Sequence, residues 1–143
     1  MANLVVWRAE FDRCWPWLWA SLCAYGNPTH NKDQVWQRIV TGKAFMWPGE
    51  RSCIVAEIVY HPIGYCSCNY WLQGGDLAEL KTRHPEIEDW AKQAGCAQVT
   101  GLGRDGWSRA MNGDWRKGPS TRSKWLGEPP PVVRRALNHD PTR

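Results

Sequence analysis

A single glutamate stands inside a strongly apolar run of this sequence, and its carboxyl group is the first candidate for chemistry. Glu57 interrupts the β-branched segment 53–60, whose composition favours a strand. If the strand buries this side chain, desolvation raises its pKa and suits it to general-base work. Exposure on the wet face of the strand explains the residue equally well. The sequence therefore offers Glu57 as a catalytic candidate and leaves its role open.

Cysteine side chains could bind a metal, but their spacing does not favour it. The six are Cys14, Cys23, Cys53, Cys66, Cys68 and Cys96. None forms the C-x-x-C pair that is typical of structural zinc sites. Cys66 and Cys68 would share one face of a strand, with no second Cys or His pair at a suitable spacing. We therefore expect buried free thiols and no metal site.

Positive charge gathers near the C-terminal end of the sequence. Residues 98–143 hold nine of the 18 Lys and Arg but only four of the 14 Asp and Glu. Interleaved with tryptophan, such residues can contact phosphates and stack on bases. The candidate contacts to a partner or to phosphate are Arg104, Trp107, Arg109, Arg116, Lys117, Arg134 and Arg135. Docking on an acidic protein surface or simple solvation explains the same charges, and no helix-turn-helix or RNA-binding motif accompanies them.

Two helices are expected before the first strand. An apolar stripe over 16–25 predicts a helix with Pro16 at an early position and Gly26 as its stop. Asn31 and Gln34 can then cap a second helix, whose apolar face ends at Gly42.

The periodicity changes to that of strands from Ala44. Segments 44–47, 53–60 and 65–72 each favour a strand, with turns at Pro48-Gly49 and Pro62-Ile63-Gly64 between them. This succession predicts an antiparallel meander, which Gly74-Gly75 closes.

A long helix and a parallel strand should follow the meander. Asp76 and Glu79 make a capping pair for a helix that is kinked at Pro85 and ends at Gly95. A strand over 96–102 then implies a right-handed parallel crossover. Beyond it we expect a short helix capped by Asp105 and one or two weak edge strands within 115–125. An extended tail follows, with one helical turn around 133–137.

This order of elements, together with several short sequence segments, resembles a family of small tailed-bacteriophage proteins that have the acetyltransferase (GNAT) fold. The segments are residues 33–42, which begin with Asp33-Gln34-Val35-Trp36, residues 54–58, residues 71–77, residues 87–91 with Gly95-Cys96, and residues 103–107. The resemblance spans about residues 14 to 126. It implies an α/β fold with a GNAT-like mixed sheet, an antiparallel meander plus a parallel crossover, flanked by helices. The domain would be residues 1–126, and residues 127–143 would be a Pro-rich basic tail.

The resemblance also implies where a cofactor would bind. In active members of the superfamily, the turn before the long helix offers backbone N–H groups to the pyrophosphate of coenzyme A. The matching residues here are Gln73, Gly74, Gly75, Asp76 and Leu77. The turn is shorter than the usual Q/R-x-x-G-x-G/A loop, and Asp76 puts a negative charge where phosphate would lie. Capping of the helix by Asp76 explains the same residues.

The catalytic residues that the resemblance implies are matched only in part by this sequence. The resemblance makes Glu57 the best candidate for the base that deprotonates the amine. No tyrosine follows Tyr70, so the usual acid is missing from the expected region. Cys96, His84 or Tyr70 could substitute, although packing or surface exposure explains each of them.

Composition is that of an ordinary globular protein. A chain of 143 residues with 43% hydrophobic and 22% charged residues fits one domain. Eleven tryptophans stand against two phenylalanines; we expect most of them in the core and some on partner surfaces. No apolar run approaches the roughly 18 residues of a membrane span. Without a signal-peptide pattern, we expect synthesis in the host cytoplasm.

Three functions remain open. The first is a virion-associated protein that uses a non-catalytic acetyltransferase-like scaffold to dock on other virion proteins. The second is a coenzyme A-dependent N-acetyltransferase that takes acetyl-CoA and acts on a host or phage amine. The third is a nucleic-acid-binding accessory protein. The shortened turn and the missing tyrosine place the first ahead.

Overall fold

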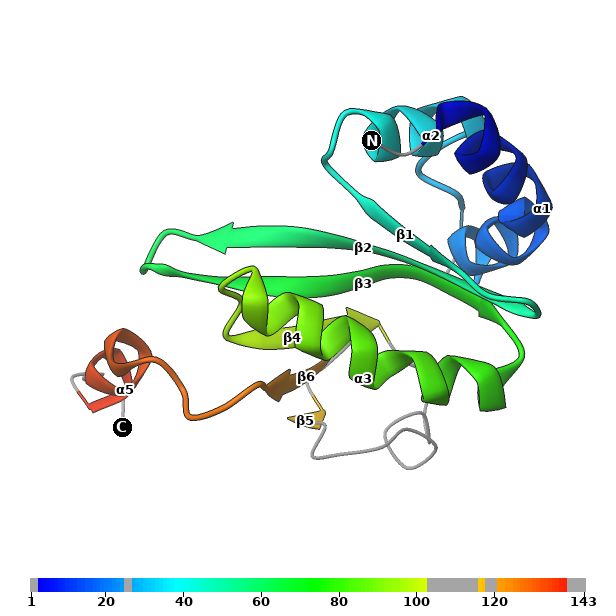
Figure 1. Cartoon of the computed structure of the whole chain (residues 1–143). Helices are drawn as coiled ribbons and strands as arrows, with labels where there is room; N and C mark the ends of the chain where they lie inside the picture. Colours follow the sequence, from blue (N-terminus) through cyan, green and yellow to red (C-terminus); the bar gives the residue numbers. More distant parts are fainter. Residues whose placement is uncertain (1–2, 25–26, 103–115, 118–120, 139–143) are drawn as a thin grey trace. The chain divides into compact units, whose positions relative to one another are not determined.

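The chain is a mixed α/β protein in a computed structural model that describes residues 3–24, 27–102, 116–117 and 121–138. Six strands are hydrogen-bonded in the order β1-β2-β3-β4-β6-β5, and helices flank this mixed sheet (Figure 1). The expected α/β class and mixed sheet are confirmed. The chain divides into two compact units: Met1–Glu57 with Tyr70–His84, and Ile58–Asn69 with Pro85–Arg143.

The first helix begins much earlier than the sequence suggests. α1 spans Leu4–Cys23, and the side chain of Asn3 caps it by accepting a hydrogen bond from the Val5 N–H. Pro16, predicted near the start, lies in the interior of α1. The prediction was wrong because burial of Phe11 outweighs the local cost of a proline within the helix.

The second helix forms as expected. α2 spans Lys32–Val40, and Asn31 and Gln34 form a reciprocal capping box, with each side chain bonded to the other's backbone N–H. Gly42, which follows the helix, has a φ of 77°, a conformation that L side chains rarely adopt.

Three strands follow, as the change of periodicity predicts. They are β1 (Phe45–Pro48), β2 (Ser52–His61) and β3 (Tyr65–Gly75). β1 and β2 are antiparallel, with Phe45 opposite Ala56 and Pro48 opposite Cys53. β3 continues through Gly74 and Gly75 rather than ending before them.

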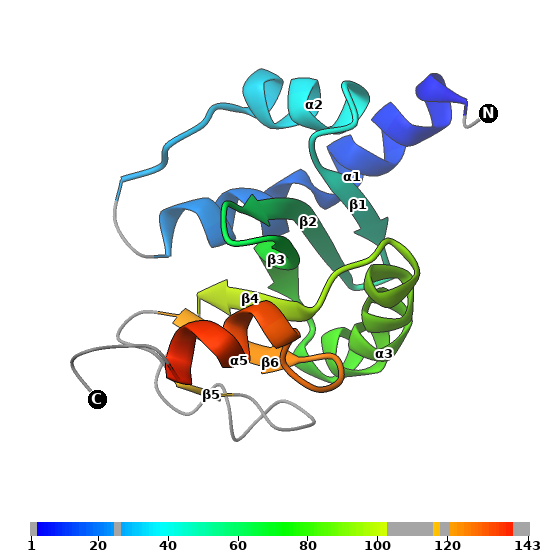
Figure 2. The same cartoon turned by 90° about the vertical axis from the view of Figure 1, so that its left-hand side faces the viewer.

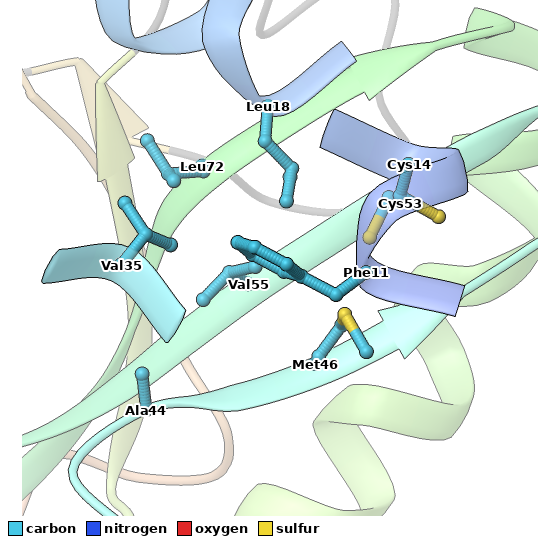
Figure 3. Close-up of a cluster of buried hydrophobic side chains, with 9 residues drawn as sticks. All are labelled: Phe11, Cys14, Leu18, Val35, Ala44, Met46, Cys53, Val55 and Leu72. Carbon is cyan, nitrogen blue, oxygen red and sulfur yellow. The ribbon is translucent and has the colours of Figure 1, made fainter. Parts of the chain in front are cut away.

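A hydrophobic core fills the first unit between its helices and strands. Side chains from α1, α2, β1, β2 and β3 converge in Figure 3, where Phe11 lies among them. The cluster consists of Phe11, Cys14, Leu18, Val35, Ala44, Met46, Cys53, Val55 and Leu72.

The tryptophans surround this core instead of forming its centre. Trp7, Trp15, Trp17, Trp36 and Trp71 are half-buried and pack against the cluster. Of the tryptophans that the structure describes, none is fully buried. An indole is large and its N–H needs a polar partner, so the edge of a core suits it better than the centre.

The second unit contains the segment of β3 that lies beside β4. Residues of β4 (Gln98–Leu102) contact residues of β3 that lie 31 positions earlier in the sequence. The Ala97 N–H donates to the Cys66 carbonyl, the Gln98 side chain bonds Ser67, and the Thr100 side chain bonds Asn69. Because this sequence separation stays the same along the two strands, they run parallel. β6 (Thr121–Trp125) pairs antiparallel with β4, and β5 (Arg116–Lys117) pairs with β6 at the edge (Figure 2).

One helix, α3 (Leu77–Gln93), connects β3 to β4 and contains Pro85. Gly95, with a φ of 89°, ends it, and the Cys96 N–H donates to the Ala91 carbonyl. The short helix expected after Asp105 falls outside the described residues.

The C-terminal segment is more helical than expected. α5 spans Pro131–Asn138, where the sequence suggested an extended tail with one helical turn. Pro131 is the first residue of the helix, a position at which a missing N–H costs nothing. None of the helices in the described part of the chain is long and apolar enough to span a bilayer.

Candidate functional site

The first candidate site is the turn between β3 and α3, residues 73–79. Asp76 caps α3 by accepting a hydrogen bond from the Ala78 N–H over 3.0 Å. Its second carboxylate oxygen accepts from the Arg51 Nε over 3.1 Å, and this guanidinium holds the pKa of Asp76 below its usual value. The Asp76 N–H donates to the Arg51 carbonyl. The first turn of α3 is thereby bonded to the β1–β2 turn.

Glu79 also bonds the first turn of α3 to the β1–β2 turn. Its carboxylate accepts hydrogen bonds from the Ser52 hydroxyl at 2.5 Å and from the Arg51 N–H at 3.1 Å. The bond from Ser52 is the main reason that the pKa of Glu79 is lowered. The sequence suggested that Glu79 reaches back to cap α3; it bonds to the β1–β2 turn instead, because that turn exposes a donor N–H and a hydroxyl.

The two glycines of the turn permit close approach of other backbone segments. A Cβ on Gly74 would lie 2.5 Å from the carbonyl oxygen of Trp17, and one on Gly75 would lie 2.3 Å from that of Arg51. Gly75 also has a φ of 105°. Packing of α1 and the β1–β2 turn against this backbone therefore accounts for both glycines.

Gln73 and Leu77 differ in their surroundings. The Gln73 N–H donates to the Ser21 hydroxyl, and its side-chain oxygen lies 3.0 Å from Nε2 of buried His84. The imidazole of His84 stacks on the ring of Tyr70, with 4.6 Å between ring centroids. Leu77 is exposed. His84 and Tyr70, both proposed as substitute acids, therefore lie together in the interior of the first unit.

The second candidate site is centred on Glu57. Its half-buried carboxylate accepts a hydrogen bond from Arg38 Nη2 over 2.9 Å, which joins β2 to α2. The Arg38 guanidinium also lies over the ring of Trp71, 5.5 Å from its centroid, and the His30 ring meets Trp71 edge-on. These contacts assemble a charged pair and an aromatic ring at one place.

An open hollow of about 420 Å³ adjoins this group along α2. Polar side chains line it: Thr29, His30, Asn31, Asp33, Gln34, Gln37 and Arg38. Sequence reasoning missed His30, Arg38 and Trp71 because their association depends on tertiary contacts. A polar open hollow with a cation and imidazole at its rim can hydrogen-bond a small polar ligand.

The cysteines form close pairs but no metal centre. Within the described residues, no cluster of three or more His, Cys, Asp or Glu is arranged to hold a metal. Five cysteines are buried, Cys23 is half-buried, and all six are free thiols. In the second unit the sulfurs of Cys66 and Cys96 lie 3.8 Å apart. Burial is the main cause that raises the pKa of Cys96 to about 12.

The basic candidates are only partly described. Arg104, Trp107 and Arg109 fall outside the described residues. Arg116 and Lys117 form β5, and Arg134 and Arg135 are exposed on α5, where Arg134 approaches Glu128 at 3.5 Å. Comparison of the whole chain with protein-family models, with curated proteins and with solved structures yields no match.

Proposed function

We propose that this protein is a non-catalytic docking component of a bacteriophage particle, built on an acetyltransferase-like scaffold. The observation that carries the proposal is the chemical state of the 73–79 turn. A pyrophosphate site needs free N–H groups and positive potential at a helix N-terminus. Here Asp76 and Glu79 bring two carboxylates to that place.

The donor groups of the turn are already in use, which is the physical reason that coenzyme A should not bind there. Both carboxylates have lowered pKa values, so both are charged at neutral pH. The Ala78 and Arg51 N–H groups already donate to them. A pyrophosphate would have to displace these bonds and compete with both carboxylates for the Arg51 guanidinium, which is ion-paired with Asp76 and Glu79.

A docking role is supported by three consecutive exposed aliphatic side chains at the start of α1. Leu4, Val5 and Val6 are 61%, 78% and 58% exposed. A group of adjoining aliphatic side chains in contact with water is typical of surfaces that bind other proteins. The virion as the place of docking rests on the resemblance to tailed-phage proteins.

Two measurements test the proposal. Washed particles should contain this protein in a fixed ratio to the capsid protein, and its absence from them would remove the virion role. Titration calorimetry with acetyl-CoA should give no binding heat, with a known acetyltransferase as the positive control. A saturable heat at one site per chain would contradict the non-catalytic scaffold.

Coenzyme A-dependent acetyl transfer is the second candidate, favoured by Glu57 beside a polar hollow. The carboxylate of Glu57 would accept the proton of an amine held along α2, and acetyl-CoA would supply the acetyl group. Release of free coenzyme A thiol in the presence of a polyamine or a lysine peptide tests this reaction. A rate that wild type shows and Glu57→Gln lacks would establish it over the docking role.

A further inference from the structure

Among the strands that the structure describes, none pairs with the outer edge of β2 along the second half of this strand. Strand β1 pairs with β2 only from Cys53 to Ala56. Before β1, the N–H groups of Lys43 and Ala44 both donate to the Arg38 carbonyl at 2.9 Å, so the chain turns away to α2. Among the described residues, no other strand is hydrogen-bonded to this side of β2.

The hydrogen-bond pattern identifies which groups face this edge. Gly49 N–H donates to the Ser52 carbonyl, which makes these residues a hydrogen-bonded pair. Antiparallel pairs alternate, so Ile54 and Ala56 also direct their N–H and C=O groups toward β1. The same alternation directs those of Ile58 and Tyr60 toward the open edge.

We propose that the 58–60 edge of β2 pairs antiparallel with the same edge of a second copy of this chain, forming a two-fold symmetric dimer. Centred on Val59, this register places Ile58 opposite the partner's Tyr60 and makes both hydrogen-bonded pairs. Val59 then lies opposite the partner's Val59 as the closer, non-hydrogen-bonded pair. This inference does not depend on the proposed function.

Self-pairing is favoured by the residues that this register brings together. A β-branched residue opposite an aromatic ring is a stabilising cross-strand pair. Val59 and Tyr60 are 37% and 77% exposed, so their side chains are available for such contacts. No charged residue occupies 58–60, and natural open edges usually carry one to prevent pairing.

The residues at the ends of the paired segment already have partners within their own chain. The register places Glu57 opposite the partner's His61, but Glu57 is ion-paired with Arg38 and the His61 ring is bonded to the Ser67 hydroxyl. The four backbone hydrogen bonds and the Ile58–Tyr60 and Val59–Val59 contacts are therefore what would hold the two copies together. The paired segment is short, so we expect a weak dimer whose population rises with concentration.

Sedimentation equilibrium over a wide concentration range is the first test. Wild type should show a monomer–dimer equilibrium, and a monomer at every concentration would overturn the proposal. Val59→Lys places two cations directly opposite each other and should weaken dimerisation by roughly tenfold or more. Ile63→Lys is the matched control, because it adds the same charge to an exposed position in the turn beyond the edge. Equal weakening by both variants would exclude the β2 edge as the interface.

Cross-linking tests the register with a milder change. Val59→Cys, oxidised with diamide, should give a disulfide-linked dimer because non-hydrogen-bonded pairs bring the two side chains close. Ile63→Cys should cross-link no more than wild type, whose own cysteines provide the background. Failure of Val59→Cys to exceed that background would overturn the proposed pairing.

Discussion

The Glu79 carboxylate and the Ser52 hydroxyl are joined by a hydrogen bond of 2.5 Å, although 27 residues separate them. This bond fixes the first turn of α3 against the start of β2. Together with the Asp76–Arg51 ion pair, it makes the 73–79 turn a structural joint between a helix and a hairpin.

Acid should weaken this joint. The pKa values of Glu79 and Asp76 are lowered in the folded protein from ordinary values of 4.5 and 3.8. The unfolded chain therefore binds protons first, so their stabilising contribution is complete above pH 4.5 and is lost as the pH falls through the lowered values. The urea midpoint of wild type should fall more steeply with acid than that of the double variant Asp76→Asn, Glu79→Gln. Identical pH profiles would contradict the role given to these carboxylates.

Gly74→Ala should destabilise the first unit. The new methyl group would lie 2.5 Å from the Trp17 carbonyl oxygen, and backbone cannot move aside cheaply. We expect a loss of about 1–3 kcal/mol in the free energy of unfolding, measured by denaturant titration. Gly127→Ala is the control, because a Cβ there meets nothing within 4 Å. Equal effects of the two substitutions would count against the packing account of Gly74.

Phe11→Ala should be among the most destabilising single changes. The side chain is fully buried and touches the rings of Trp15 and Trp36 at centroid distances of 5.6 and 5.2 Å. Removing it should cost about 3–5 kcal/mol, whereas Phe11→Leu should cost less because most of the volume remains. Thermal or denaturant unfolding of both variants measures the difference. A small effect of Phe11→Ala would mean that α1 does not belong to the core.

Thiol labelling should separate one cysteine from the other five. Cys23 is half-buried, whereas the remaining cysteines are buried. Burial raises the pKa of both Cys68 and Cys96 to about 12, so these thiols stay protonated and unreactive at neutral pH. A maleimide should therefore label one site quickly and the rest only after denaturation, and Cys23→Ser should remove the fast site. Rapid labelling of several thiols in that variant would contradict the buried arrangement.

Arg38→Lys should be costly for a conservative change. The guanidinium bonds Glu57 and lies over Trp71 at the same time, whereas an ammonium lacks the planar group that does both. Because the Arg38 side chain is 34% exposed, solvent limits the loss to about 1 kcal/mol in denaturant unfolding. A Lys variant as stable as wild type would show that the position needs only a positive charge.

Local signals in the sequence predicted the elements that local contacts stabilise. The capping box of Asn31 and Gln34 and the β1–β2 turn depend on residues a few positions apart, and both form as expected. The start of α1 could not be found in this way, because residues 4–15 become a helix largely through burial of Phe11 and Cys14. A proline at position 16 then indicated the wrong boundary.

The candidate sites were predictable only in part. The sequence indicates Glu57 and the Gln73–Leu77 segment as candidate sites. It contains no sign that Arg38 pairs with Glu57 or that Arg51 pairs with Asp76. Both partners lie on other elements, at separations of 19 and 25 residues. Charge balance of a site is a tertiary property, so composition could not reveal it.

The long sequence separation between the contacting residues of β3 and β4 also affects the order in which the chain can fold. Ser67 meets Gln98 and Asn69 meets Thr100 across loops of 31 residues each. Closing a loop of that length costs roughly 3 kcal/mol of chain entropy before any contact forms. The Gly49–Ser52 turn avoids most of this entropy cost, since its two hydrogen-bonded residues are close in the sequence. Nucleation therefore favours the hairpin, and arrival of β4 beside β3 is the expected slow kinetic step.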